Sequence, residues 1–137
     1  KSGRCAIRGS LVRMEEFGKL PENLSVYSYV DQIGALKKAD AFLSHCGMNS
    51  VNESLYFGMP LVMRLQISEQ GGMARRAEQL GAGRMLKGTD AKSVLEAVEC
   101  VLEDEKYKES AKKIEEGFQR CSGARGAARK ILEVCGS

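Results

Sequence analysis

Short strand-like segments alternate with segments of helical periodicity through the middle of the chain, and this alternation limits the chain to few folds. The strand-like segments are rich in apolar, β-branched and aromatic residues, whereas the segments between them carry apolar residues at helical spacing. Strands that alternate with helices in this way predict an α/β fold, with a parallel sheet and helices on both of its faces. The expected strands cover 5–12, 24–29, 41–44, 61–65 and 84–86, and the expected helices cover 32–39, 49–57 and 73–80.

The last third of the chain has the most regular helical pattern. Apolar residues recur there at the spacing of one helix face in three successive stretches, 91–102, 107–118 and 124–135. We therefore expect three amphipathic helices after the last strand. The most basic part of the chain lies here, and we interpret it as a solvated helix face before an anion-binding site; it contains Arg120, Arg125, Arg129 and Lys130.

The composition is that of a soluble globular domain. The chain has 137 residues, of which 43% are hydrophobic and 28% charged, and this is enough apolar material for the core of one ordinary domain. The formal net charge is only +3, and Lys and Arg alternate with Asp and Glu along most of the length. This balance argues against nucleic acid as a partner. The first residue is Lys1 rather than Met, so we expect a processed, excised or truncated piece.

Five cysteines accompany a single histidine, and their arrangement argues against a zinc site. The number of cysteines is odd, their spacing is irregular, and no pair is separated by two residues. We interpret them as reduced thiols, which favours a cytoplasmic protein. No apolar run approaches the roughly 20 residues that span a bilayer, so no transmembrane segment is expected, and no signal peptide is visible.

The first loop that points to function follows the third expected strand and reads HCGMNSVNES. In parallel sheets of this class, ligands bind beyond the carboxyl ends of the strands, near the N-termini of the following helices. His45 can donate a hydrogen bond at the strand end, and Gly47 lets the backbone turn tightly. Asn49 and Ser50 stand where the helix begins, with side chains suited to an N-cap, and such a helix start suits a phosphate group. Glu53, in the first helical turn, can accept two hydroxyl hydrogen bonds, as from a ribose.

This first loop also has a structural interpretation, which the residues alone leave open. Ser50 and Glu53 match the spacing of a capping box, which needs no ligand. His45 could equally be a structural histidine whose ring nitrogens are satisfied by the backbone.

A second loop follows the fourth expected strand and contains Glu69 beside Gln70, ahead of a glycine-rich helix start. A carboxylate next to an amide suits several sugar hydroxyls, because both accept hydrogen bonds and the amide also donates them. Position alone favours a structural alternative, since exposed Glu–Gln pairs are ordinary and Glu69 would complement the dipole of the next helix.

Together, these segments resemble a known family. The stretch YVDQIGALKKADAFLSHCGMNSVNESLYFGMPLVMRLQISEQGGMARRAEQLGAGRML is similar to the donor-binding signature of family 1 UDP-glycosyltransferases, shared by bacterial macrolide-type and plant secondary-product enzymes. The resemblance covers roughly residues 22–87, and it is specific because HCGxNSxxE, GxP and EQ occur in order at the family's intervals. It implies a GT-B fold, in which two Rossmann-like domains face each other across a cleft. Residues 1–137 would be the C-terminal, donor-binding domain, truncated at its N-terminus.

The resemblance assigns a set of residues to the UDP-sugar and none to catalysis. They are His45, Gly47, Asn49 and Ser50 for the diphosphate, Glu53 for the ribose, Tyr29, Val30 and Gln32 for the base, and Glu69 and Gln70 for the sugar.

The sequence departs from the family pattern at several of these places. Tyr29 is a smaller platform than the Trp that stacks on uracil in many relatives, and Asp31 stands where Pro is usual. Leu65 replaces a common Pro, and Glu69 replaces the commoner Asp, although bacterial relatives also have Glu. These departures concern the base and sugar preference and leave the fold unaffected.

The resemblance implies transfer of a sugar from a UDP-sugar to a hydroxyl of a small-molecule acceptor, with inversion and without a metal or other cofactor. UDP-glucose is the expected donor. In the family, the acceptor pocket and the catalytic His belong to the N-terminal domain, which is expected to be missing here together with the first strand and glycine-rich loop of the donor domain. The isolated chain is therefore expected to be inactive.

Three alternatives remain from the sequence. The chain could be a stand-alone donor-binding subunit that needs a partner, or a module that binds a sugar nucleotide without turning it over. It could also be a Rossmann-like interaction domain that has capping boxes and no ligand.

Overall fold

The computed structural model describes residues 5–8, 19, 21–65 and 71–136. The chain divides into two compact units, residues 1–35 and residues 36–137. No helix within the described ranges is long and apolar enough to cross a membrane.

The first unit contains a small parallel sheet and the start of a short helix. Strand β1 (Cys5–Arg8) pairs in parallel with β2 (Leu24–Tyr27). Helix α1 (Gln32–Leu36) begins where the Ala35 N–H donates to the Asp31 carbonyl over 2.9 Å. The expected first strand is thus confirmed over its first four residues, and the rest of it lies outside the described residues.

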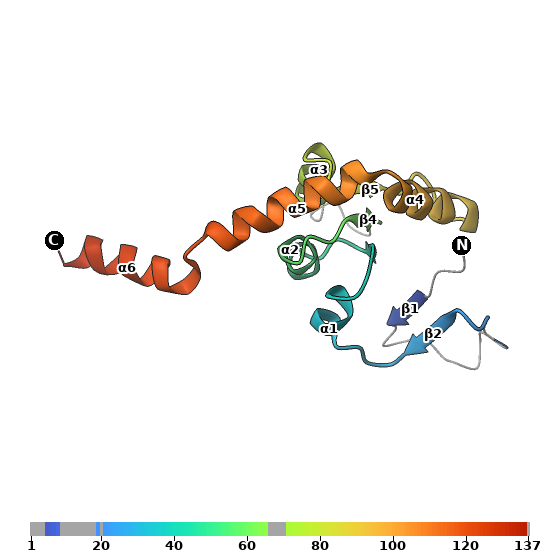
Figure 1. Cartoon of the computed structure of the whole chain (residues 1–137), viewed down its shortest axis with the longest axis horizontal. Coiled ribbons are helices and arrows are strands. Elements are labelled where there is room, and N and C mark those ends of the chain that lie inside the picture. Colours follow the sequence, from blue (N-terminus) through green and yellow to red (C-terminus); the bar gives the residue numbers. More distant parts are fainter. Residues whose placement is uncertain (1–4, 9–18, 20, 66–70, 137) are drawn as a thin grey trace. The chain divides into compact units, whose positions relative to one another are not determined.

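The second unit is built on a three-stranded parallel sheet in the order β3–β4–β5. The strands are β3 (Phe42–Ser44), β4 (Leu61–Met63) and β5 (Gly83–Met85), and the register pairs Ser44 with Met63 and Met63 with Met85. Helix α2 (Met48–Tyr56) lies between β3 and β4 in the chain, and α3 (Gly71–Gln79) lies between β4 and β5. All three strands therefore end at one edge of the sheet, where the loops that lead into the helices begin (Figure 1).

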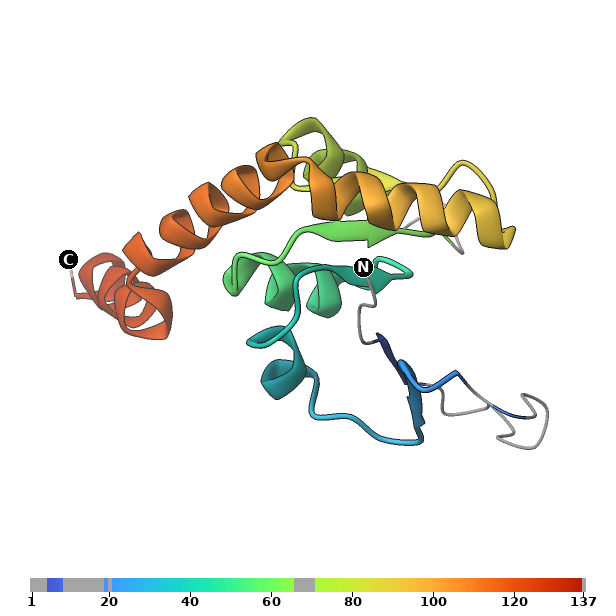
Figure 2. The same ribbon diagram turned by 45° about the vertical axis from the view of Figure 1, so that its right-hand side comes forward.

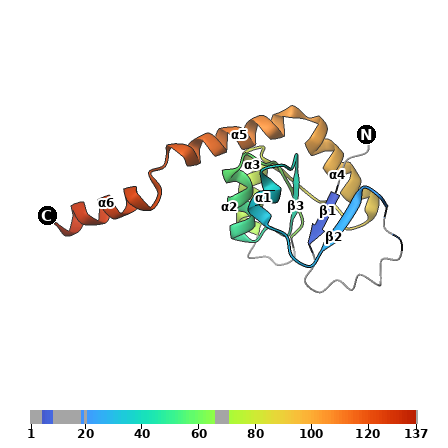
Figure 3. The same cartoon turned by 60° about the horizontal axis from the view of Figure 1, so that its bottom comes forward.

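Helices cover both faces of this sheet, as the sequence predicts. Leu61 and Met63 belong to a core shared with α2 and α3, and between them Val62 packs on Ala97 and Val101 of helix α4 (Ala91–Glu103). Figure 3 shows α2 and α4 on opposite sides of the sheet. A central strand that is covered on both faces must be apolar throughout, and all three residues of β4 are buried.

The three predicted C-terminal helices are confirmed. Helix α5 (Glu105–Arg120) follows α4 after a sharp bend at Asp104, whose carboxylate accepts from the Lys106 N–H over 3.0 Å (Figure 2). Ala111 is the buried residue of α5 and belongs to the core that includes α2. Helix α6 (Gly123–Cys135) buries none of its residues. The basic residues of this region are all exposed, which agrees with a solvated helix face; they are Arg120, Arg125, Arg129 and Lys130.

A polar contact ties β5 to α4. The Arg84 guanidinium donates to the Cys100 sulfur over 2.8 Å. Cys100, followed by the hydroxyl of Tyr107 on α5, raises the pKa of Arg84, so this guanidinium stays charged. Burial is the main cause that raises the pKa of the Tyr107 hydroxyl. Arg84 thus has a hydrogen-bond partner within the fold and links β5 to α4.

Helix α4 has a titratable N-cap, and its stability should depend on pH. The Asp90 carboxylate accepts from the Ser93 hydroxyl over 2.7 Å and from the Ser93 N–H over 3.1 Å, and these bonds lower the Asp90 pKa below its ordinary 3.8. Because the folded pKa is depressed, this stabilisation is fully present above the unfolded pKa and is lost as the pH falls through the folded pKa. We expect Asp90→Ala to lower the melting temperature at neutral pH, and to lower it much less in strong acid.

The matched control for this prediction is Asp90→Asn, which keeps an N-cap acceptor but does not titrate. Melting curves of the three proteins from neutral pH down to well below 3.8 measure the effect. An Asp90→Ala deficit that stays constant over this range would contradict the assignment.

Candidate functional site

The turn from β3 into α2 is made by a cysteine in a conformation that favours glycine. Cys46 has a φ of 67°, while Gly47 has a φ of −57° and a ψ of 140°. The expectation that Gly47 supplies the tight turn is therefore wrong, because its backbone angles are open to any residue. The Cys46 N–H donates to the Ser44 hydroxyl over 3.1 Å, and this bond helps to hold the left-handed residue in place.

The Cys46 side chain is structural. It is 1% exposed and belongs to the main core. Burial raises the pKa of its thiol, and a hydrogen bond with the Arg64 backbone opposes this rise. A neutral buried thiol behaves as a small apolar side chain, in agreement with the reduced cysteines expected from the sequence.

The conformation of Cys46 leads to a stability prediction. We expect Cys46→Gly to be more stable than Cys46→Ala by about 1 kcal/mol, because glycine adopts a positive φ without the penalty that a Cβ brings. Denaturant unfolding of the two variants measures the difference. Val51, buried in α2, is the control position. There we expect Val51→Ala to be more stable than Val51→Gly by about 1 kcal/mol, because alanine has the higher helix propensity. The same order at both positions would refute a strained turn at Cys46.

Gly47 lies close to the side chain of His45. A Cβ built on Gly47 would lie 3.3 Å from the Nε2 atom of His45, tighter than an ordinary contact. The imidazole of His45 thus lies directly against the backbone that enters α2, and its side chain is exposed. The ring and the start of the helix therefore present hydrogen-bonding groups to the same small region.

Helix α2 begins without a side-chain cap. Its N-cap residue is Gly47, no side chain bonds to the cap, and the Val51 N–H makes a helical bond to the Gly47 carbonyl over 3.1 Å. Asn49 and Ser50 lie inside the helix, so the expectation that they occupy the N-cap is wrong, and a capping box between Ser50 and Glu53 is excluded. The first turn of a helix exposes N–H groups that have no partner within the helix, and these attract an anion.

One face of α2 carries the predicted polar residues, and the opposite face is buried. Glu53 stands four residues after Asn49 and three after Ser50, so all three lie on the same side of the helix. Glu53 is partly exposed, whereas Val51 and Leu55 are buried. The site can therefore offer a helix N-terminus, an imidazole and, one turn along, a carboxylate.

The remaining predicted residues lie elsewhere in the chain. Tyr29 is 76% exposed in the first unit, where Val30 and Gln32 are partly exposed. Glu69 and Gln70 lie outside the described residues. The structure thus brings together the predicted residues that follow β3, namely His45, Gly47, Asn49, Ser50 and Glu53.

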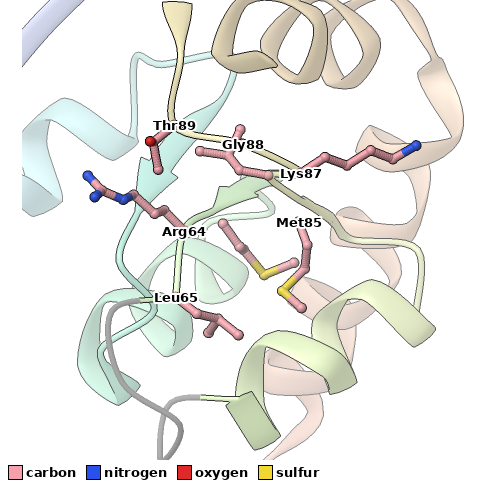
Figure 4. A pocket seen from close by; sticks show the side chains of 8 residues that line it. Arg64, Leu65, Met85, Lys87, Gly88 and Thr89 are labelled. Carbon is pink, nitrogen blue, oxygen red and sulfur yellow. The ribbon is translucent and has the colours of Figure 1, made fainter.

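A hollow at the ends of β4 and β5 was missed from the sequence. Its volume is about 180 Å³, and Figure 4 shows the side chains that line it. The sequence contained a signal for this hollow, because each expected strand end marks a place where ligands of α/β proteins bind. Among the described residues, no group of three or more His, Cys, Asp or Glu is placed to hold a metal ion. The lining consists of Met63, Arg64, Leu65, Met85, Leu86, Lys87, Gly88 and Thr89.

The parallel sheet and the helices on both of its faces have the fold found in GT-B glycosyltransferases. The solved structure of the glycotransferase of kitacinnamycin matches 95% of this chain with a TM-score of 0.87 and 27% sequence identity. The calicheamicin glycosyltransferase CalG4 matches 93% of it with a TM-score of 0.84 and 26% identity.

The family follows from the sequence comparisons. Residues 13–116 match the family described as UDP-glucoronosyl and UDP-glucosyl transferase, and the chain belongs to this family. It is 36% identical over 128 residues to the uncharacterized UDP-glucosyltransferase YojK of Bacillus subtilis, an alignment that covers 92% of this chain and 32% of YojK. The chain spans about a third of the length of the curated relatives and solved structures that it matches.

Proposed function

We propose that this chain is the nucleotide-sugar-binding part of an enzyme that transfers a sugar from a UDP-sugar, with UDP-glucose as the expected donor. The acceptor is a hydroxyl group of a small molecule, and the transfer inverts the anomeric carbon. One observation carries most of the proposal: the uncapped start of α2 lies beside the exposed imidazole of His45, with Glu53 one turn away on the same helix.

The proposed roles follow the chemistry of each group. The diphosphate accepts hydrogen bonds from the first turn of α2, including Asn49 and Ser50, and from His45. The Glu53 carboxylate accepts hydrogen bonds from the ribose hydroxyls. The base and the sugar contact residues outside this helix; we assign Tyr29, Val30 and Gln32 to the base, and Glu69 and Gln70 to the sugar.

The proposed mechanism is a direct displacement in which UDP is the leaving group. Negative charge grows on the diphosphate as the bond to the sugar breaks, and fixed donors at the helix start stabilise this charge without having to reorganise. We propose that the reaction needs no metal. The residues that activate the acceptor are expected in a separate, N-terminal domain, so no residue of this chain is assigned to general base catalysis.

Ligand-observed NMR with UDP and UDP-glucose tests this function on the chain as it is. We expect both ligands to bind, and UDP-glucose to bind more tightly because its sugar makes further hydrogen bonds. Uridine should bind more weakly than UDP, since it lacks the diphosphate. Equal affinity for uridine and UDP would contradict the proposed role of α2, and an absence of binding by all three would contradict the donor-site proposal.

A further inference from the structure

Arg64 and His45 are neighbours at the carboxyl edge of the sheet. Each directly follows a strand, and the last residues of these two strands, Met63 and Ser44, are paired in register. The Arg64 N–H donates to the Ser44 carbonyl over 2.9 Å. Since paired strands lie about 4.8 Å apart, the backbones of Arg64 and His45 are adjacent.

The Arg64 side chain is exposed and lacks an acidic partner among the described residues. The ion pairs found there are Lys92–Glu96 and Lys130–Glu133. Arg84, by contrast, donates a hydrogen bond to the Cys100 sulfur within the fold. The planar guanidinium carries five donors and matches the oxygens of a phosphate group.

The part of the hollow that the described residues form carries no negative side chain, since none of these eight lining residues is Asp or Glu. Figure 4 shows that Arg64 extends away from Met85 on the side of Thr89, while Lys87 extends to the opposite side. The two cations therefore point apart. Of the two, Arg64 is the one whose backbone lies next to His45, and its guanidinium has no acidic partner in the part of the chain that the structure describes.

We infer that Arg64 is a further contact to the diphosphate of the nucleotide sugar, an inference that rests on the proposed function. The helix start offers partial charges, whereas the guanidinium adds a full positive charge. Arg64 binds the diphosphate together with His45 and stabilises the charge that grows on it during transfer. It acts on the phosphates alone and leaves the affinity for the nucleoside unchanged.

The test compares Arg64→Gln with the matched variant Lys87→Gln, which removes an exposed cation from the other side of the same hollow. Titration calorimetry or NMR gives the affinities for UDP and for uridine. We expect Arg64→Gln to weaken UDP binding roughly ten-fold, with uridine affinity unchanged, because a charge-assisted hydrogen bond is lost. Lys87→Gln should leave both affinities unchanged, and Arg64→Lys should recover part of the lost UDP affinity.

Three results would overturn the inference. The first is an unchanged UDP affinity in Arg64→Gln. The second is a loss of UDP affinity in Lys87→Gln as large as that in Arg64→Gln, which would indicate a general charge effect. The third is an equal loss of affinity for UDP and uridine in Arg64→Gln, which would indicate a structural effect. The failure of the proposed function looks different, since the unchanged chain would then bind no UDP at all.

Discussion

Replacing Glu53 with alanine should lower the affinity of the chain for UDP by at least roughly ten-fold and leave the fold intact. Glu53 is partly exposed on α2, on the same side as Asn49 and Ser50. A carboxylate there can accept two hydroxyl hydrogen bonds, and hydrogen bonds to a charged group contribute about 1.5–3 kcal/mol each. Titration calorimetry measures the affinity, and the melting temperature shows whether the fold is kept.

A modified ligand makes this experiment specific to the ribose. UDP that lacks the 2′ and 3′ hydroxyls should bind the unchanged protein and Glu53→Ala with the same affinity, because the interaction that Glu53 provides is already missing. Glu53→Gln should lie between the two proteins, since an amide accepts one set of hydrogen bonds but carries no charge. Equal UDP affinity in the unchanged protein and in Glu53→Ala would remove the ribose assignment.

Leu61→Ala should lower the free energy of unfolding by about 3 kcal/mol. Leu61 is fully buried on the central strand, and its backbone is held by pairing with β3 on one side and β5 on the other. A Cβ added to Gly83, its partner in β5, would lie 3.0 Å from the Leu61 carbonyl oxygen, so the strands are already closely packed. The backbone therefore has little freedom to close the cavity that Leu61→Ala would leave. The expected loss of unfolding free energy is accordingly well above the loss caused by truncating an exposed side chain.

Leu95→Ala is the matched control for this prediction, because Leu95 is also a leucine but is 57% exposed on α4. Its cost should stay below about 1 kcal/mol. Denaturant unfolding of both variants, with equal slopes, provides the comparison. A loss in Leu61→Ala no larger than that in Leu95→Ala would show that β4 is not the centre of the core.

The fold explains why one edge of the sheet concentrates the polar groups. Parallel strands in the order β3–β4–β5 all end on the same side, and the residues that follow them become neighbours although they lie far apart in the chain. His45, Arg64 and Thr89 come from three different loops of this edge. An enzyme built on such a sheet can change its ligand by changing these loops, while the strands keep the core.

The sequence by itself determined the order and type of the elements and the loop that carries the candidate site. Apolar runs and helical periodicity depend on local patterns, and they predicted the strands, the helices of both faces and the three C-terminal helices. The motifs HCGxNSxxE, GxP and EQ are also local, and their order and intervals predicted the family to which the chain belongs. Strand lengths were overestimated, because apolar residues that flank a strand, such as Leu65, pack against the core without joining the ladder.

Only the tertiary structure decided the backbone conformation and the contacts of the residues in that loop. The turn falls on Cys46 rather than Gly47, because the buried thiol and the Ser44 hydroxyl hold a positive φ that no sequence pattern reveals. Gly47 lies against the ring of His45, a contact that depends on rotamer and backbone together. The adjacency of Arg64 and His45 depends on strand register, which pairs segments that are distant in sequence and is set by packing across the whole sheet.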